Sequence, residues 1–182
     1  AELLECTYFF YGLEPYQKRL EKLVKQDPLN IKVAAMAAYV SKKENIKNIY
    51  PFCKNPLNFI FKQNIKNRLT STDKFYENLL ELLRKVQCIW EPLSTTTKGG
   101  YQTLGNLFNS NDIEILKLQK IIKDQIDIYR ETYKSSEEHF ITKWPQKCYL
   151  NAWHVKLLKE GHQEAHIHPS KWLSGVFYLK VP

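Results

Sequence analysis

Residues 147–182 read KCYLNAWHVKLLKEGHQEAHIHPSKWLSGVFYLKVP, and this stretch holds most of the histidines of the chain. The two apolar runs of this stretch are predicted to be strands, and they cover Tyr149–Leu158 and Trp172–Val181. Between the runs, an ionisable side chain occupies every second position, at His162, Glu164, His166 and His168. Because alternate side chains of an extended backbone share one face, we expect these four to point the same way.

Two of these side chains, His166 and His168, are the candidate metal ligands. In a strand their Cα atoms would lie about 6 to 7 Å apart, a spacing at which two imidazoles can bind one ion. Pro169 cannot donate a hydrogen bond to a sheet, which places the pair at the end of a strand. Imidazole binds iron, zinc, copper and nickel, so the pair indicates a metal without identifying it. The alternative is two ordinary surface or core histidines.

Two segments of the chain resemble one family. Trp153–Pro182 has a tryptophan strand, a turn at Gly161, then H-x-H-P and W-L-S-G-V-x-Y-L-x-V-P. Upstream, residues 98–108, KGGYQTLGNLF, are similar to a G-x-Q-T-x-x-N-L-F segment. Both resemble the N-terminal part of the catalytic domain of 2-oxoglutarate- and Fe(II)-dependent oxygenases, which are often attached to tetratricopeptide repeats. The resemblance covers residues 55–182.

This resemblance implies a double-stranded β-helix, a jelly-roll-like fold of two facing antiparallel sheets, with Fe(II) and 2-oxoglutarate as cofactors. Iron in such enzymes is held by two histidines and a carboxylate. Carried onto this chain, His166 is the first ligand, and His168 stands where most relatives have an aspartate. Tyr178 falls where related enzymes place a tyrosine that contacts the far carboxylate of 2-oxoglutarate, with a core aromatic as the alternative.

The resemblance also implies later strands that carry a distal histidine ligand and an arginine for 2-oxoglutarate. Those strands would follow Pro182. We therefore expect residues 51–182 to be helical support plus the first strands of a catalytic domain that is incomplete at its C-terminus. This chain is expected to be inactive alone.

Helices are predicted ahead of these strands. Apolar residues recur with helical spacing in Leu13–Gln26, and Asp27-Pro28 ends that helix. A second helix is predicted at Ile31–Ser41, and the pair joined by D-P-x-N resembles a tetratricopeptide hairpin. Residues 1–50 are thus predicted to be a helical domain that binds a protein partner, with a helical cap on the barrel as the alternative. The predicted fold class is α+β.

Between the hairpin and the histidines, the pattern predicts four further segments. Leu57–Phe61 alternates like a short edge strand, and Phe75–Val86 has the stripe of a helix with one buried face. Glu91–Gly105 is predicted to be a loop in which Gln102 and Thr103 either face substrate or, as we favour, satisfy backbone groups. A long helix is predicted to end near Tyr133.

Composition limits the classes of partner and compartment. The net charge is +8, but the basic residues are spread along the chain without a nucleic-acid-binding signature, so nucleic acid is not favoured as a partner. No apolar run approaches the roughly 18 to 20 residues of a membrane span, and the N-terminus does not read as a signal peptide. Four cysteines without a C-x-x-C pair indicate a reducing, cytoplasmic or otherwise intracellular compartment.

The function predicted from these patterns is an oxygenase. It would couple oxidation of an unidentified protein or small molecule to decarboxylation of 2-oxoglutarate. The first alternative is a non-catalytic helical-repeat protein with a degenerate barrel. The second is a cupin-like metal-binding protein that uses His162, His166 and His168 without 2-oxoglutarate.

Overall fold

The computed structural model of this chain describes residues 1–65 and 74–181. Contacts divide the chain into two compact units. Unit 1 comprises residues 1–62, 129–146 and 167–175, and unit 2 comprises residues 63–128, 147–166 and 176–182. Each unit has its own apolar core. None of the helices in the described ranges is long and apolar enough to cross a membrane.

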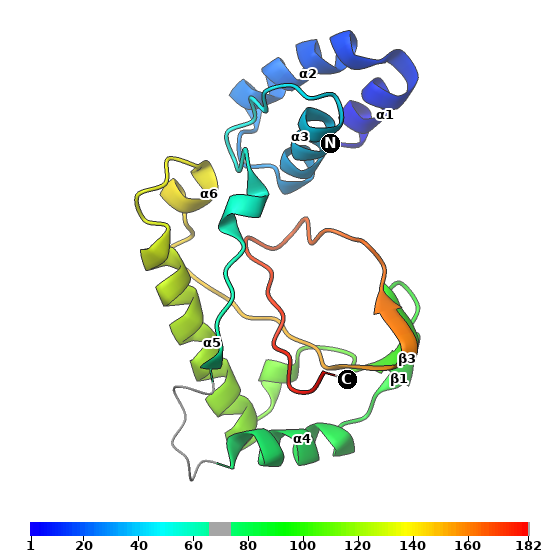
Figure 1. The fold of residues 1–182 in the computed structure, drawn as a ribbon, viewed down its shortest axis with the longest axis vertical. Helices are drawn as coiled ribbons and strands as arrows, with labels where there is room; N and C mark the ends of the chain where they lie inside the picture. The colour runs from blue at the N-terminus through cyan, green and yellow to red at the C-terminus, as the bar shows by residue number, and fades with distance from the viewer. Residues whose placement is uncertain (66–73, 182) are drawn as a thin grey trace. The chain divides into compact units, whose positions relative to one another are not determined.

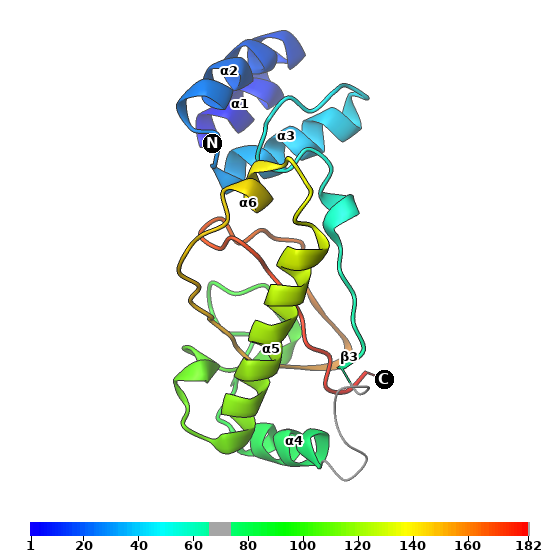
Figure 2. The same cartoon turned by 90° about the vertical axis from the view of Figure 1, so that its left-hand side faces the viewer.

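Unit 1 begins with three helices, α1 (Glu2–Tyr11), α2 (Leu13–Gln26) and α3 (Ile31–Lys43) (Figure 1). Figure 2 shows α1 and α2 lying side by side. The helices predicted from sequence at α2 and α3 are confirmed. Each carries a stripe of small or apolar residues on one side, which is the pattern that predicts it. The sequence did not predict α1, whose apolar residues lie on every side and leave Phe10 and Tyr11 exposed. The core formed by the three helices includes Leu4, Tyr16, Leu20, Val33, Ala37 and Val40.

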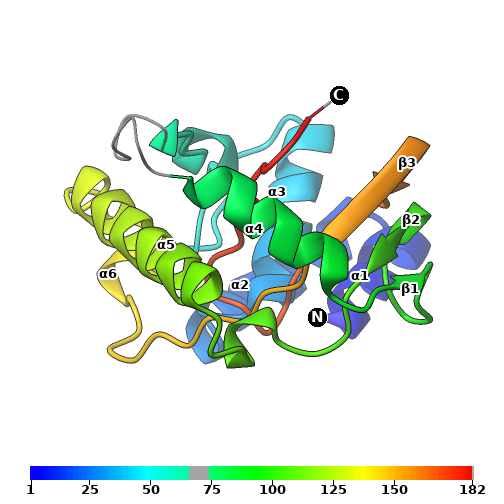
Figure 3. The same ribbon diagram turned by 90° about the horizontal axis from the view of Figure 1, so that it is seen from below.

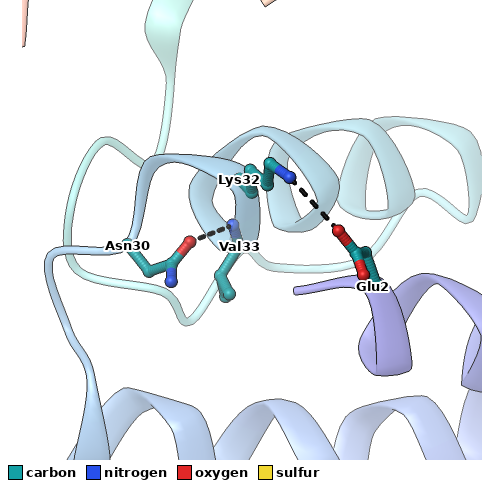
Figure 4. Close-up of polar contacts among 4 residues, drawn as sticks. All are labelled: Glu2, Asn30, Lys32 and Val33. Atoms are coloured by element: carbon teal, nitrogen blue, oxygen red, sulfur yellow. Dashed lines mark hydrogen bonds and ion pairs between the residues drawn. The ribbon is translucent and has the colours of Figure 1, made fainter. Parts of the chain in front are cut away.

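The turn between α2 and α3 is closed by polar contacts. The Asn30 side-chain oxygen accepts a hydrogen bond from the Val33 amide at 3.1 Å and caps α3 (Figure 4). An ion pair of 3.4 Å joins Lys32 to Glu2 at the start of α1 (Figure 4). Tyr50 is fully buried, and its hydroxyl accepts from the Asn30 amide at 2.9 Å and donates to the Asp27 carbonyl.

We expect Tyr50→Phe to lower the free energy of unfolding by about 2 kcal/mol, because the partly buried Asn30 amide and the Asp27 carbonyl both lose their hydrogen-bond partner. Urea unfolding measures this loss, and Tyr11→Phe is the control because Tyr11 is exposed.

The stabilising effect of Tyr50 also depends on pH, because burial raises the pKa of its hydroxyl to about 12. Its contribution to the free energy of unfolding is present below the unfolded-state pKa of about 10 and is lost as the pH rises toward 12. Equal stabilities of the two variants would contradict this role.

The predicted edge strand at Leu57–Phe61 is wrong. The chain forms a 3₁₀ helix, η1 (Pro56–Phe59), because proline at the first helical position has a suitable φ and needs no N–H acceptor there. The Phe59 ring packs edge-on against Phe140 of the short helix α6 (His139–Thr142), at 4.6 Å between centroids. The Phe59 carbonyl also accepts from the Tyr129 hydroxyl at 3.1 Å.

The core of unit 2 lies between α4 (Phe75–Lys85) and α5 (Ile113–Thr132), which Figure 3 shows near each other. Both helices were predicted, and α5 belongs to unit 2 as far as Ile128. The buried stripe of α4 packs against the first turns of α5, and the cluster consists of Phe75, Leu79, Leu83, Ile115 and Leu118. A short 3₁₀ helix, η3 (Leu107–Asn109), precedes α5.

Three antiparallel strands form the sheet of unit 2, in the order β1-β2-β3. They are β1 (Ile89–Trp90), β2 (Thr97–Gln102) and β3 (Val155–Gln163) (Figure 3). Together with the helices, this sheet is consistent with the predicted α+β class. Strand β3 begins and ends later than the predicted Tyr149–Leu158, and β2 lies within the segment predicted to be a loop.

The second predicted strand, Trp172–Val181, is not assigned as a strand. The alternating pattern of this segment nevertheless directs two of its apolar side chains toward the core of unit 2. Phe177 and Leu179 pack against the core of unit 2, and the Phe177 ring stacks on Tyr76 at 6.2 Å. The alternation therefore anchors side chains without forming a ladder of backbone hydrogen bonds.

Gly161 does not form the predicted turn but lies inside β3, at an irregularity in its pairing with β2. A Cβ atom at Gly161 would lie 2.4 Å from the carbonyl oxygen of Gly99. Gly99 itself has a φ of 60°, in the region that favours glycine. The two strands can therefore approach each other this closely only because both residues lack a side chain.

Candidate functional site

The candidate metal ligands follow β3 in irregular backbone. Of the alternating set, only His162 lies in the strand, so the prediction of one continuous extended strand is wrong. The reason is the length of β2, whose pairing reaches only Thr97 opposite Gln163. One more hydrogen bond, from the Glu164 amide to the Thr96 carbonyl at 2.8 Å, closes this edge before the chain leaves the sheet.

His166 is exposed, and the backbone carbonyl two residues earlier orients its ring. The Nδ1 atom lies 2.7 Å from the Glu164 carbonyl oxygen. A carbonyl can only accept, so Nδ1 carries the hydrogen and the lone pair of the neutral ring is on Nε2. Metal-binding histidines usually have this arrangement, with one ring N–H held by a carbonyl or carboxylate. His162 repeats the arrangement less closely, with Nδ1 at 3.3 Å from the Glu160 carbonyl oxygen.

His168 is half-buried, and the turn after Pro169 closes with a 3.0 Å hydrogen bond from the Lys171 amide to its carbonyl. The division between the two units falls between His166 and Ile167. The two candidate ligands thus belong to different units, and their convergence on one ion stays a prediction. No group of three or more histidine, cysteine, aspartate or glutamate side chains suited to a metal ion occurs within residues 1–65 and 74–181.

Tyr178, the candidate 2-oxoglutarate contact, has 72% of its surface exposed. Its neighbours Phe177 and Leu179 are the residues that pack against the core. Tyr178 is therefore not a core aromatic in this structure. Its contact with a cofactor stays a prediction.

Gln102 and Thr103 have structural contacts, as the sequence analysis favoured. The Thr103 hydroxyl accepts from the His154 amide at 2.9 Å, and the Thr103 amide donates to the His154 carbonyl at 3.0 Å. The Gln102 side-chain oxygen accepts from the buried Thr97 hydroxyl at 2.6 Å. These bonds hold β2 and the chain around β3 together.

A thiol and an imidazole that no sequence pattern indicates lie together at one end of the sheet. The Cys88 Sγ lies 3.9 Å from the His154 Nδ1, and both residues are half-buried. Burial, followed by the charge of Lys156, lowers the pKa of His154. Burial raises the pKa of Cys88, and Lys156 opposes that rise. No spacing motif links residues 88 and 154, because only the pairing of three strands brings them together.

Comparison with protein families gives a match to the C-terminal segment of the chain. A family model described as "Putative 2OG-Fe(II) oxygenase" matches residues 151–182, the segment that holds all the candidate ligands. No curated protein and no solved structure matches the chain.

Proposed function

We propose that this chain carries the opening part of the catalytic domain of a 2-oxoglutarate- and Fe(II)-dependent oxygenase. The observation that carries the proposal is the family match over residues 151–182, because that segment contains His166, His168 and Tyr178. The antiparallel sheet that precedes the histidines is compatible with the first strands of a double-stranded β-helix. In this proposal His166 and His168 bind iron, and Tyr178 contacts the far carboxylate of 2-oxoglutarate.

The side chains present fit part of an iron site. Imidazole is a suitable ligand for Fe(II), and the Glu164 carbonyl orients the His166 ring so that Nε2 carries the lone pair. With O2 and 2-oxoglutarate, such an iron centre supplies the oxidant that hydroxylates a bound substrate. The described residues provide two imidazoles for the three positions of a facial triad. We therefore expect no turnover of 2-oxoglutarate by this chain with added Fe(II).

The residue at position 168 sets the charge of the proposed site. An imidazole in place of the usual carboxylate removes one negative charge, which weakens the attraction for a divalent cation. Two opposite unit charges about 4 Å apart in water attract by about 1 kcal/mol, or about fivefold in affinity, which is a lower bound for a carboxylate bound to a divalent ion. His168→Asp should thus bind a divalent metal more tightly than the natural chain.

Metal affinity tests this proposal without any need for turnover. We expect His166→Ala to weaken Co(II) binding, used as a stand-in for Fe(II), by at least about tenfold, and His168→Asp to strengthen it by at least about fivefold. Titration calorimetry measures both changes. His139→Ala is the control, because His139 lies in α6, away from the candidate ligands in sequence. Unchanged affinity in both site variants would end the iron proposal.

A cupin-like metal site is the second candidate, and the orientation of His162 favours it. The His162 Nδ1 faces the Glu160 carbonyl oxygen at 3.3 Å, which leaves the lone pair on Nε2 as in His166. If His162 is a ligand, His162→Ala should weaken Co(II) binding as much as His166→Ala. In that case 2-oxoglutarate should not raise the melting temperature of the metal-loaded chain, whereas an oxygenase site should bind it and be stabilised.

The exposed apolar residues of α1 favour a partner-binding role for the N-terminal helices. Leu3, Phe10 and Tyr11 each have more than 60% of their surface exposed. Large apolar side chains gathered on one short helix are typical of protein interaction surfaces. We propose that a protein partner contacts this helix, whether or not the histidine site is catalytic. Phe10→Glu should then abolish capture of that partner while leaving metal binding unchanged.

A further inference from the structure

One end of the sheet in unit 2 brings a thiol and an imidazole together. The pairing of Ile89 with Gln102 and of Gln102 with Val155 continues for one residue past the strands. That next row consists of Cys88, Thr103 and His154. The 2.9 Å and 3.0 Å hydrogen bonds between Thr103 and His154 fix the backbone beneath the imidazole. As a result, the Cys88 Sγ lies 3.9 Å from the His154 Nδ1.

A cation and two aromatic rings continue the same face of the sheet. By strand alternation, Lys156 follows His154, Tyr101 precedes Thr103, and Trp90 follows Cys88 on this face. The Lys156 ammonium lies 6.0 Å from the Tyr101 ring centroid, and the Tyr101 and Trp90 rings meet edge-on at 5.0 Å. In the described part of the chain, no carboxylate forms an ion pair with Lys156. Its charge is therefore available to an incoming anion.

The geometry points to Cys88 as a modification site that forms a mixed disulfide with small disulfides carrying carboxylates. In this assignment His154 is the base, and Lys156 is the cation that attracts the anionic reagent. Reactive cysteines typically lie in partly exposed, electropositive surroundings, and Cys88 is half-buried beside Lys156. This inference is independent of the proposed iron site.

The exchange needs no reagent beyond the disulfide. The Cys88 thiol hydrogen passes to the His154 Nδ1 as the sulfur attacks one sulfur atom of the disulfide. A bond forms between the Cys88 Sγ and that sulfur, and the reagent's own S–S bond breaks. The leaving thiolate then takes the proton from His154 and departs as a thiol. One disulfide and one thiol are consumed, and one of each is formed.

Charge and burial explain why a base is required. Burial keeps the Cys88 thiol protonated at neutral pH by raising its pKa, so a thiolate is not preformed. Burial and Lys156 lower the pKa of His154, which makes it a weaker base than an ordinary histidine but keeps the ring neutral and able to accept a proton. The Cys88 Sγ also lies 3.4 Å from the Val86 carbonyl oxygen, an alternative acceptor for the resting thiol hydrogen. A carbonyl cannot take up the proton, which leaves His154 as the base.

Oxidised glutathione is the probe, and mass spectrometry of the intact and digested chain measures adduct formation at each cysteine. We expect Cys88 to react at least about tenfold faster than Cys53. Burial raises the pKa of the half-buried Cys53 thiol to about 12, and no hydrogen bond to an imidazole is found for it among residues 1–65 and 74–181. Cys88→Ser should remove the fast adduct. His154→Ala should slow it about tenfold, and Lys156→Gln about fivefold. Lys159→Gln, at another exposed lysine of β3, is the control for general charge.

The natural chain supplies a test that does not depend on the variants folding. The exposed thiol of Cys148 is the comparison, because a thiol without a neighbouring base reacts about tenfold faster for each added pH unit while it is mostly protonated. At Cys88 the rate should instead be flat above the pKa of His154 and fall in more acid solution. A Cys88 rate that follows the same slope as Cys148, or that equals the Cys53 rate, would overturn the assignment. If Cys88 reacted equally fast with a neutral disulfide and with oxidised glutathione, Lys156 would have no role in attracting the reagent.

Discussion

Gly161→Ala is expected to destabilise the chain by about 3 kcal/mol, the upper range for an added group in a packed site. The new Cβ atom would lie 2.4 Å from the Gly99 carbonyl oxygen and 3.1 Å from the Leu158 carbonyl oxygen. Both obstacles are backbone atoms, which cannot rotate aside as a flexible side chain can. Relief requires β2 and β3 to move apart where Lys98 pairs with His162. Urea unfolding measures the loss.

The matched control for this substitution is Gly175→Ala. A Cβ atom at Gly175 would meet nothing within 4 Å, and its φ is not in the left-handed region. Alanine there should be neutral or stabilising by about 0.5 kcal/mol, because it restricts the unfolded chain. If the two alanine variants were equally stable, the close approach of Gly99 and Gly161 would not be a constraint on the fold.

Leu79→Ala should cost about 3 kcal/mol, within the usual range for removing a buried leucine side chain. Leu79 is 0% exposed and occupies the centre of the α4 stripe between Phe75 and Leu83. Its loss would leave a cavity against Ile115 and Leu118 of α5. The free energy of unfolding from chemical denaturation gives the effect.

Leu93→Ala removes the same atoms from a leucine that is 95% exposed, and we expect it to change stability by less than about 0.5 kcal/mol. A small effect at both positions would mean that α4 and α5 do not form the core of unit 2. A large effect at Leu93 would instead show that this side chain is covered in solution.

The parts of the fold that the sequence predicted are those specified by local spacing. The helices α2, α3, α4 and α5 were predicted because each repeats apolar residues along one side. The strand β2, with the sequence TKGGYQ, has no apolar alternation. Its two glycines permit close approach to β3 instead, a requirement that depends on a partner some 60 residues away in sequence. The boundaries of β3 were misplaced for the same reason, because pairing with β2 sets them.

The candidate site shows the same limit. The alternation of His162, His166 and His168 was visible in the sequence, but the strand stops at Gln163 because β2 extends no farther. The orientation of the His166 ring depends on the Glu164 carbonyl, which every residue possesses and no pattern reveals. Cys88 and His154 meet only through the order of three strands. The family resemblance indicates the segment, whereas these contacts depend on how distant parts of the chain pair in the fold.

The segment that carries Tyr178 is held in an unusual way. Phe177 and Leu179 pack against the core of unit 2, while no backbone–backbone hydrogen bond joins residues 176–181 to the described residues. Side-chain anchorage and amide protection are thus separate properties here. The segment can be well placed and still exchange its amide hydrogens with solvent at nearly the rate of an unfolded peptide.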